Sequence, residues 1–373
     1  MRANPTWEDL PLRPELRSAR PYGAPQLDLP VCLNVNENPY PLPEAVHQAM
    51  MAAVESTLAN IHRYPDREAL VLRGKLATYL GHGLSANQIW AANGSNEVMT
   101  EILQCFAGPG RTLLTFPPTY SMYPEYARNT HTQFVTTPRR EDFQIDLDQV
   151  AQAISLYHPD VIVIANPNNP TGTLTTLEDI EAILNLSEAI VIVDEAYQEF
   201  SSAPSALDLL DHYGNLIVAR TMSKAFAFAG GRLGYAAAAT TIIDALRVVR
   251  LPYHLSALTQ AVAGAALDHA EAMLAQVDHL SLLREATIEQ LRALGLTVID
   301  SRANFFLFGP FADRHATWQA LVDRGVLVRE TGPESYLRVS VGTDQEMETF
   351  IYALAAVLAP DPAASPNSQR SAA

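Results

Sequence analysis

The sequence has almost no lysine. Lys75 and Lys224 are the two that occur, so arginine supplies nearly all of the 25 basic residues. Acidic residues number 41, and the formal net charge is −16. A surface that binds duplex nucleic acid needs clustered basic side chains against the phosphates, and no such run is present. The composition argues against nucleic-acid binding, and a reaction that needs a lysine amine has two candidates.

Cysteine and long apolar runs are equally scarce. Cys32 and Cys105 are far apart and follow no metal-ligand spacing, so we expect no disulfide, no metal site and a reduced, cytoplasmic compartment. The N-terminus lacks the apolar core of a signal peptide, and no run reaches the roughly 18 apolar residues of a membrane span. Secretion and membrane insertion are therefore not expected. At 373 residues and 48% hydrophobic, the chain is long enough for about two domains.

Short apolar runs alternate with helical patterns in the middle of the chain. The runs expected to form strands are TLLTF (112–116), QFVTT (133–137), VIVIA (161–165), IVIVD (190–194) and LIVAR (216–220). Strands that are apolar on both faces and separated by helices are what a buried, mostly parallel sheet requires. We therefore expect residues 31–252 to form a large, doubly wound α/β domain.

The two ends of the chain follow other patterns. Residues 1–30 are rich in Pro and Arg without a period, and are expected to form an arm that lies on another part of the protein. Long helical patterns with a few strands predict a smaller α+β domain over 253–358, whose first helix should span 256–276. The segment 359–373 is rich in Pro, Ser and Ala and is expected to be disordered.

Polar side chains gather where the predicted strands end. Asn169 follows VIVIA, Asp194 and Tyr197 lie at and after the end of IVIVD, and Ser223 and Lys224 follow LIVAR. Ligands bind beyond the carboxyl ends of the strands in sheets of this kind. Each residue alone also fits a plain structural role, such as a surface lysine or a helix cap. Their convergence at one edge favours a shared site.

These residue types suit a pyridoxal cofactor, which needs a lysine, a carboxylate, partners for its phenolic oxygen and an anion cradle. Lys224 would form the imine, and Asp194 would pair with the pyridine nitrogen. Tyr197 and Asn169 could donate to the phenolic oxygen. The cradle would comprise Ser95, Asn96, Thr221, Ser223 and Arg232, and Tyr120 could stack on the ring.

The cradle depends in part on the turn in IWAANGSNEVMTEILQCFAG, which predicts a strand, a Gly-Ser-Asn turn and a helix. Ser95 or Asn96 is expected to cap that helix. Unpaired N–H groups and the helix dipole at such an end favour a phosphate. An ordinary helix cap is the alternative interpretation.

The motifs as a set resemble the histidinol-phosphate aminotransferase family of fold-type-I pyridoxal-phosphate enzymes. They are LNVNENP (33–39), RYP (63–65), GSNE (94–97), PTYSMY (118–123), NPNNPTG (166–172), VDEAYQEF (193–200), RTMSKAFAFAGGRLGY (220–235), PYHLS (252–256), ANFFLF (303–308) and YLRVSVGT (336–343). The resemblance runs from about residue 22 to 358. It implies a homodimer with shared active sites and amino-group exchange between histidinol phosphate and 2-oxoglutarate, in histidine biosynthesis.

The resemblance also implies roles for individual residues. Lys224 would be the Schiff-base lysine, and the other cofactor contacts would be those named above. Tyr64 would reach the cofactor phosphate from the other subunit. Arg338 and Arg329 would hold the substrate carboxylate or phosphate, and the residues near the imidazole would be Tyr22, Asn36 and Glu37.

One motif departs from the family pattern. GSNE stands where a GADE-type turn is common, which leaves backbone phosphate binding intact but changes the side chain that faces the ring. Three alternatives to the histidinol-phosphate reaction remain open. They are an aromatic amino acid aminotransferase, a pyridoxal-phosphate-dependent lyase or decarboxylase, and a non-catalytic sensor that binds the cofactor.

Overall fold

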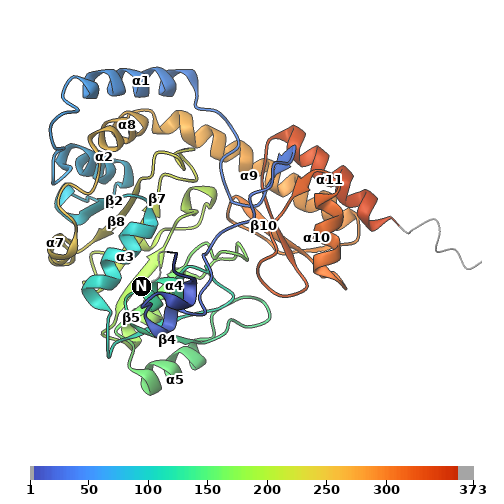
Figure 1. Ribbon diagram of the computed structural model, residues 1–373, viewed down its shortest axis with the longest axis horizontal. Helices are drawn as coiled ribbons and strands as arrows, with labels where there is room; N and C mark the ends of the chain where they lie inside the picture. Colours follow the sequence, from blue (N-terminus) through green and yellow to red (C-terminus); the bar gives the residue numbers. More distant parts are fainter. Residues whose placement is uncertain (1–3, 360–373) are drawn as a thin grey trace, which may run out of the picture.

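The computed structural model describes residues 4–359, which form two units lying side by side (Figure 1). The larger unit is built on a seven-stranded sheet with the order β2-β8-β7-β6-β5-β3-β4. Its strands are β2 (Ile89–Ala92), β3 (Thr112–Thr115), β4 (Gln133–Thr136), β5 (Val161–Ala165), β6 (Ile190–Asp194), β7 (Leu216–Thr221) and β8 (Gly234–Ala238). β8 alone in this sheet runs antiparallel to its neighbours. The predicted mostly parallel sheet is confirmed.

Helices cover both faces of this sheet, because its strands are apolar on both sides. In β5, Ile162 and Ile164 join one core, while Val161, Val163 and Ala165 join the other. The helices on the second face are α3 (Ser95–Phe106), α4 (Tyr123–Asn129) and α7 (Thr240–Val249). Those on the first include α2 (Leu70–Leu80), α5 (Leu147–Tyr157) and α6 (Leu177–Leu186). The doubly wound α/β arrangement is therefore as predicted.

The smaller unit is built around a three-stranded antiparallel sheet with the order β12-β10-β9. These strands are β9 (Thr297–Val298), β10 (Phe305–Gly309) and β12 (Leu337–Ser340). Three helices, α9 (Ala270–Ala293), α10 (Arg314–Val322) and α11 (Asp344–Leu358), complete it. Early in the chain, β1 (Val31–Cys32) pairs in parallel with β11 (Val326–Leu327), so residues 31–32 belong to the smaller unit although they precede the larger unit's sheet in sequence.

The helix predicted over 256–276 is wrong in its extent. The structure has α8 (Ala257–Leu267), then a break at Asp268 and His269, then α9. α8 packs on α1 (Glu44–Leu58) and α2, whereas α9 packs against α11, so the chain must turn between them. The domain division at residue 252 stays a prediction, and the packing of α8 favours a boundary between α8 and α9.

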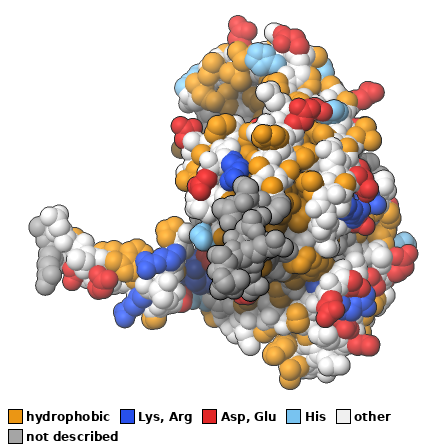
Figure 2. Space-filling view, turned by 90° about the vertical axis from the view of Figure 1, so that its right-hand side faces the viewer, with side chains coloured by type: hydrophobic (Ala, Val, Ile, Leu, Met, Phe, Trp, Pro, Cys, Tyr) orange, Lys and Arg blue, Asp and Glu red, His pale blue; other side chains and the backbone are white. Residues whose placement is uncertain are grey.

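The N-terminal segment stands out from the body of the molecule in Figure 2, and the side chain of Trp7 is 51% exposed. It contacts the larger unit through Arg13 and Glu15, which lie against His131 just after α4.

Short 3-10 helices span Trp7–Asp9, Pro14–Leu16, Ala86–Gln88, Gln198–Phe200 and Ala206–Leu209. The tail predicted to be disordered starts at residue 359, and its residues 360–373 lie outside the described part of the chain. Within residues 4–359, no helix is both long and apolar enough to cross a membrane.

Candidate active site

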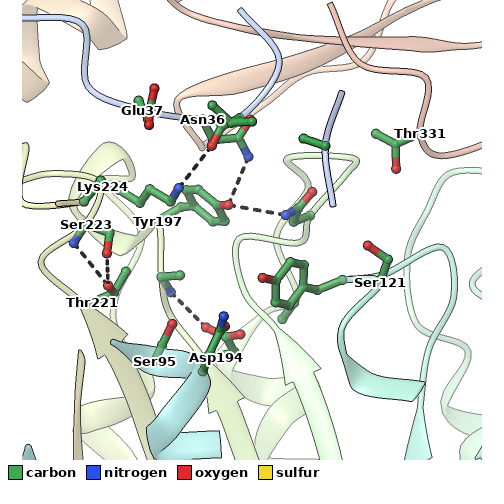
Figure 3. Close-up of a pocket in the computed structure, with 18 of the residues that line it drawn as sticks. Asn36, Glu37, Ser95, Ser121, Asp194, Tyr197, Thr221, Ser223, Lys224 and Thr331 are labelled. Carbon is green, nitrogen blue, oxygen red and sulfur yellow. Dashed lines mark hydrogen bonds between the residues drawn. The ribbon is translucent and has the colours of Figure 1, made fainter. Parts of the chain in front are cut away.

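A cavity of about 260 Å³ opens at the carboxyl ends of β5, β6 and β7 (Figure 3). Every site residue predicted from the sequence except Tyr64 lines it. Large-unit residues come from the strand ends and from the start of α3. Residues 34–37, Arg329 and Arg338 enter from the side of the smaller unit. The sheet topology therefore brings together residues that are far apart in the sequence.

Lys224 extends into this cavity from the loop after β7 (Figure 3). Its Nζ donates to the backbone carbonyl of Val35 at 3.3 Å. Burial, with the positive charges of Arg338 and Arg232, lowers the Lys224 pKa to about 8. The neutral fraction of this amine near neutral pH is therefore far larger than that of an ordinary lysine, and a nucleophile or a general base acts in the neutral form.

Asp194 ends β6 with a buried carboxylate. Tyr123 Oη–H donates to its Oδ2 at 3.0 Å, and the Ala196 N–H donates to its Oδ1 at 3.2 Å. No Lys, Arg or His forms an ion pair with it among residues 4–359. Burial raises the Asp194 pKa to about 6. A buried carboxylate without a cation is costly, so this position suits a cationic ligand atom.

The start of α3 forms an anion cradle, although its predicted cap is wrong. Gly94 is the N-cap, and Ser95 and Asn96 occupy the first helical turn, where N–H groups lack partners within the helix. Gly94 has φ +81°, and a Cβ there would lie 2.3 Å from Arg232 Nη2. The left-handed φ favours glycine at this cap, and a larger side chain there would displace the Arg232 guanidinium from the end of the helix.

β8 packs closely against the same turn at Gly94 and Ser95. A Cβ on Gly234 would lie 2.1 Å from the Ser95 backbone nitrogen. On the facing loop, Ser223 N–H donates to Thr221 Oγ1 at 3.1 Å, and Thr221 Oγ1–H donates to Ser223 Oγ at 2.9 Å. Two hydroxyls, a guanidinium and a helix N-terminus thus converge on one corner of the cavity, an arrangement that suits a phosphate.

Tyr197 and Asn169 lie together in the wall of the cavity. Asn169 Nδ2 donates to Tyr197 Oη at 3.3 Å, and Asn36 Nδ2 donates to the same oxygen at 3.0 Å (Figure 3). Asn36 was expected near the substrate, and the structure places its amide on Tyr197. Burial raises the pKa of Tyr197, so its phenol stays protonated.

Two arginines line the side of the cavity that faces the smaller unit. Arg338 Nη1 donates to Asn169 Oδ1 at 2.7 Å, and Arg329 Nη2 donates to the Gly23 carbonyl at 3.3 Å. Arg338 Nε and Arg329 Nη1 are buried without a hydrogen-bond partner among the described residues. Burial also lowers the Arg338 pKa to about 10. Unpaired guanidinium N–H groups suit a carboxylate or phosphate oxygen.

The remaining predicted residues divide into those inside and outside the cavity. Glu37 lies above Lys224 in Figure 3, and Tyr22 Oη lies 2.9 Å from Ser121 Oγ. Tyr120 also lines the cavity. Tyr64 is 81% exposed on the molecular surface, away from this chain's own cavity.

The structure adds two contacts in the site that the sequence did not predict. Tyr123, the partner of Asp194, lies within the motif PTYSMY, but nothing in the motif separates its role from that of Tyr120. Ser340 binds Asn36, and its spacing of two from Arg338 on a strand is a signal that both share one face. Among residues 4–359, no group of three or more His, Cys, Asp or Glu side chains could hold a metal ion.

Comparisons with known proteins give matches over most of the chain. Residues 30–354 match the model of the family "Aminotransferase class I and II". The chain is 54% identical to Histidinol-phosphate aminotransferase 3 of Burkholderia lata, over 94% of this chain and 96% of the relative. It is also 54% identical to the histidinol-phosphate aminotransferase of Thermobifida fusca, over 93% and 95%. A crystal structure of the Sinorhizobium meliloti histidinol-phosphate aminotransferase with pyridoxal-5'-phosphate aligns with TM-score 0.80 at 25% identity, over 88% and 91%.

Proposed function

This chain belongs to the class I and II aminotransferases, and from that premise we propose that it exchanges an amino group between histidinol phosphate and 2-oxoglutarate. In the biosynthetic direction it would consume imidazole-acetol phosphate and glutamate, as a step of histidine biosynthesis. The observation that carries the proposal is one cavity with three features: a lysine whose pKa is lowered, a buried carboxylate with no cation beside it among residues 4–359, and two arginines with N–H groups that lack partners in the same part of the chain. Each of these matches one chemical part of the reaction.

The residues present fit pyridoxal 5'-phosphate. Asp194 is a buried carboxylate with no cation paired to it within the described residues, and the turn at Gly94 is a cradle that a Cβ would fill. Asp194 would hold the protonated pyridine nitrogen, and the phosphate would lie between the start of α3, the hydroxyls of Thr221 and Ser223, and Arg232. Tyr197 and Asn169 would lie beside the phenolic oxygen, and Tyr120 against the ring. When bound, the cofactor supplies an electron sink for the amino-bearing carbon of the substrate.

Lys224 has two tasks in this proposal. Its Nζ would hold the cofactor, and as a free neutral amine the same Nζ would move a proton at the substrate carbon. The lowered Lys224 pKa, to about 8, favours both tasks because each needs the neutral amine. Its neighbours Arg338 and Arg232 contribute to that shift, so the substrate-binding and phosphate-binding charges also tune the base.

Arg338 and Arg329 would bind the anionic ends of the two substrates. Histidinol phosphate carries a phosphate and no carboxylate, whereas glutamate carries two carboxylates. A planar guanidinium binds either group in a bidentate manner, so one pocket can serve both. We expect Arg338 to hold the α-carboxylate or the phosphate, and Arg329 to add charge for the phosphate. Tyr22 and Glu37 would then lie near the imidazole.

A homodimer with shared active sites is part of the proposal. Apolar side chains are exposed on neighbouring segments around Tyr64, which stacks on Tyr253 with ring centroids 4.5 Å apart. They are Met51, Leu58, Ile61, Leu70, Val71, Val248 and Leu251. Covering them with a second copy would bury apolar area and bring Tyr64 to the partner's phosphate site.

We also propose a cytoplasmic location, because Cys32 and Cys105 are both free thiols.

The proposal is tested by comparing kcat/KM for histidinol phosphate and for phenylalanine, with 2-oxoglutarate as the acceptor. We expect a clear preference for histidinol phosphate. A preference for phenylalanine would instead identify an aromatic aminotransferase. Release of carbon dioxide without use of 2-oxoglutarate would identify a lyase. If the cofactor-loaded protein has a visible absorption that no added amine changes, it would be a non-catalytic sensor that binds the cofactor.

A further inference from the structure

The hydroxyl of Tyr197 lies between two side-chain amides. Asn36 Nδ2 is 3.0 Å from Tyr197 Oη, and Asn169 Nδ2 is 3.3 Å from it (Figure 3). An amide can present either its NH₂ group or its oxygen to a hydroxyl. The direction of these two hydrogen bonds therefore depends on what holds the other end of each amide.

Arg338 fixes the orientation of Asn169. Its Nη1 lies 2.7 Å from Asn169 Oδ1. A guanidinium has donors and no acceptor, so the oxygen of the amide must face Arg338. The NH₂ group of Asn169 therefore faces Tyr197, and it donates.

Ser340 fixes the orientation of Asn36. The backbone N–H of Asn36 donates to Ser340 Oγ at 2.8 Å, so that oxygen already accepts a hydrogen bond. The Ser340 hydroxyl donates its own hydrogen to Asn36 Oδ1, 2.9 Å away, which is its one acceptor among residues 4–359. The oxygen of this amide faces Ser340, and its NH₂ group faces Tyr197. All three side chains in this chain of contacts are buried.

Two amide donors leave Tyr197 one way to use its own hydrogen. A phenol oxygen has two acceptor sites, and Asn36 and Asn169 fill both. No residue among 4–359 accepts a hydrogen bond from Tyr197 Oη, and Tyr197 lines the cavity. Its O–H is therefore directed away from both amides and is available to a ligand in the cavity.

We propose that Ser340 and Asn36 are positioning residues that hold Tyr197 as a hydrogen-bond donor to the phenolic oxygen of the cofactor. This inference rests on the proposed function. Ser340 and Arg338 are two apart on β12 and so share a face of that strand, and between them they orient both amides. β12 belongs to the smaller unit and Tyr197 to the larger one. The position of the smaller unit therefore determines the direction of the Tyr197 O–H.

The test is the pH midpoint of the visible absorption change of the cofactor-loaded protein. A donor to the phenolic oxygen favours its ionised form and lowers this midpoint. Asn36→Asp replaces the NH₂ group by an acceptor that takes the Tyr197 hydrogen, so the midpoint should rise by about one pH unit. Ser340→Ala frees the Asn36 amide to turn round, so the midpoint should rise by a smaller amount, with no change of charge.

A double variant separates the hydrogen bond from the added charge. In a Tyr197→Phe background the O–H is gone, so Asn36→Asp should shift the midpoint clearly less than it does beside Tyr197. The control for a loosened segment is Asn304→Ala. It removes the bonds from Asn304 Nδ2 to the carbonyls of Asn36, 3.1 Å away, and Glu37, 3.4 Å away, and leaves all three side chains in the chain of contacts unchanged. Its midpoint should equal that of the wild type.

Three results would overturn the inference. They are an equal effect of Asn36→Asp with and without the Tyr197 hydroxyl, a Ser340→Ala midpoint that does not move, and an Asn304→Ala midpoint that moves as far as that of Ser340→Ala. If Asn36→Asp does not fold, the comparison of Ser340→Ala with Asn304→Ala decides alone. A wild-type chain that binds no pyridoxal phosphate would overturn the proposed function itself, which is a different and recognisable failure.

Discussion

Two buried charged clusters adjoin each other at the ends of β6 and β7, and they are built in opposite ways. In the first, Arg220 Nη2 and Nε bind Glu195 Oε2 at 2.7 and 3.0 Å. Ser205 Oγ–H donates to the same carboxylate at 2.7 Å, and the Ala206 N–H donates to its other oxygen at 2.7 Å. Every oxygen of Glu195 is therefore satisfied.

The second cluster begins one residue earlier, at Asp194, and includes Lys224. Neither side chain has an ion-pair partner within residues 4–359, and burial shifts both pKa values toward the neutral form. A protein that can pair Glu195 fully could also have paired Asp194. The comparison teaches that Glu195 finds its countercharge within the protein, whereas the unpaired cluster suits a ligand that would supply the missing charges.

The largest effect is expected from Lys224→Ala. The variant loses the amine that attaches the cofactor and moves the proton, so the amino-transfer rate should fall by at least about 1,000-fold. The visible absorption of the lysine-attached cofactor should also disappear. The control is Lys75→Ala, which removes the only other lysine and its contact with Asp268 at 2.5 Å, and should leave both properties intact. Turnover by Lys224→Ala at the wild-type rate would refute the assignment.

The paired cluster is tested by Arg220→Met. Glu195 would stay buried without its cation, so the free energy of unfolding should fall by about 3 kcal/mol in the cofactor-free protein. Denaturant unfolding of this form measures the change. An Arg220→Met variant as stable as the wild type would show that this pair does not hold the fold.

The substrate end of the cavity is tested by Arg329→Ala. The phosphate of histidinol phosphate would lose a charged partner, so its KM should rise by about tenfold to a hundredfold. The KM for glutamate should rise less, because Arg338 remains for the α-carboxylate. Steady-state kinetics with each substrate measures both values. Equal losses would place the phosphate elsewhere.

The smallest effect is expected from Glu199→Gln, at the edge of the paired cluster. Glu199 Oε1 is 3.6 Å from Arg220 Nη1, and its Oε2 has no partner among the described residues. Burial raises the Glu199 pKa and so weakens its preference for the charged form, and an amide should replace the carboxyl with a stability change below about 1 kcal/mol. Glu195→Gln is the matched comparison and should cost clearly more. Similar losses in the two variants would remove the distinction between them.

Most of the sheet and most of the site residues could be predicted from the sequence. The runs VIVIA and IVIVD match β5 and β6 to the residue, because fully apolar runs between helices have few other places in a fold. β8 was missed, since its sequence GYAAA is rich in alanine, which favours helices, and burial between β2 and β7 decides its state.

The rest of the site depended on contacts that local patterns do not encode. The cap at Gly94 lies against the Arg232 guanidinium, and the contact of Ser340 with Asn36 requires the return of β12 beside residues 34–37. The break between α8 and α9 has no proline or glycine to mark it, because it arises from packing on two different units. These features are set by residues distant in sequence.

The unfolding stability of wild type and Asp194→Asn, each without and with pyridoxal phosphate, tests most directly whether the charge of Asp194 is kept for the cofactor. The folded pKa of Asp194 is raised to about 6, above its ordinary value of 3.8, so ionising it costs stability as the pH rises through that range. At pH 8 the cofactor-free Asp194→Asn should therefore exceed the wild type by about 1–3 kcal/mol, and the cofactor should stabilise the wild type more. A cofactor-free variant that is less stable than the wild type at pH 8, or an equal gain from the cofactor in both proteins, would contradict this.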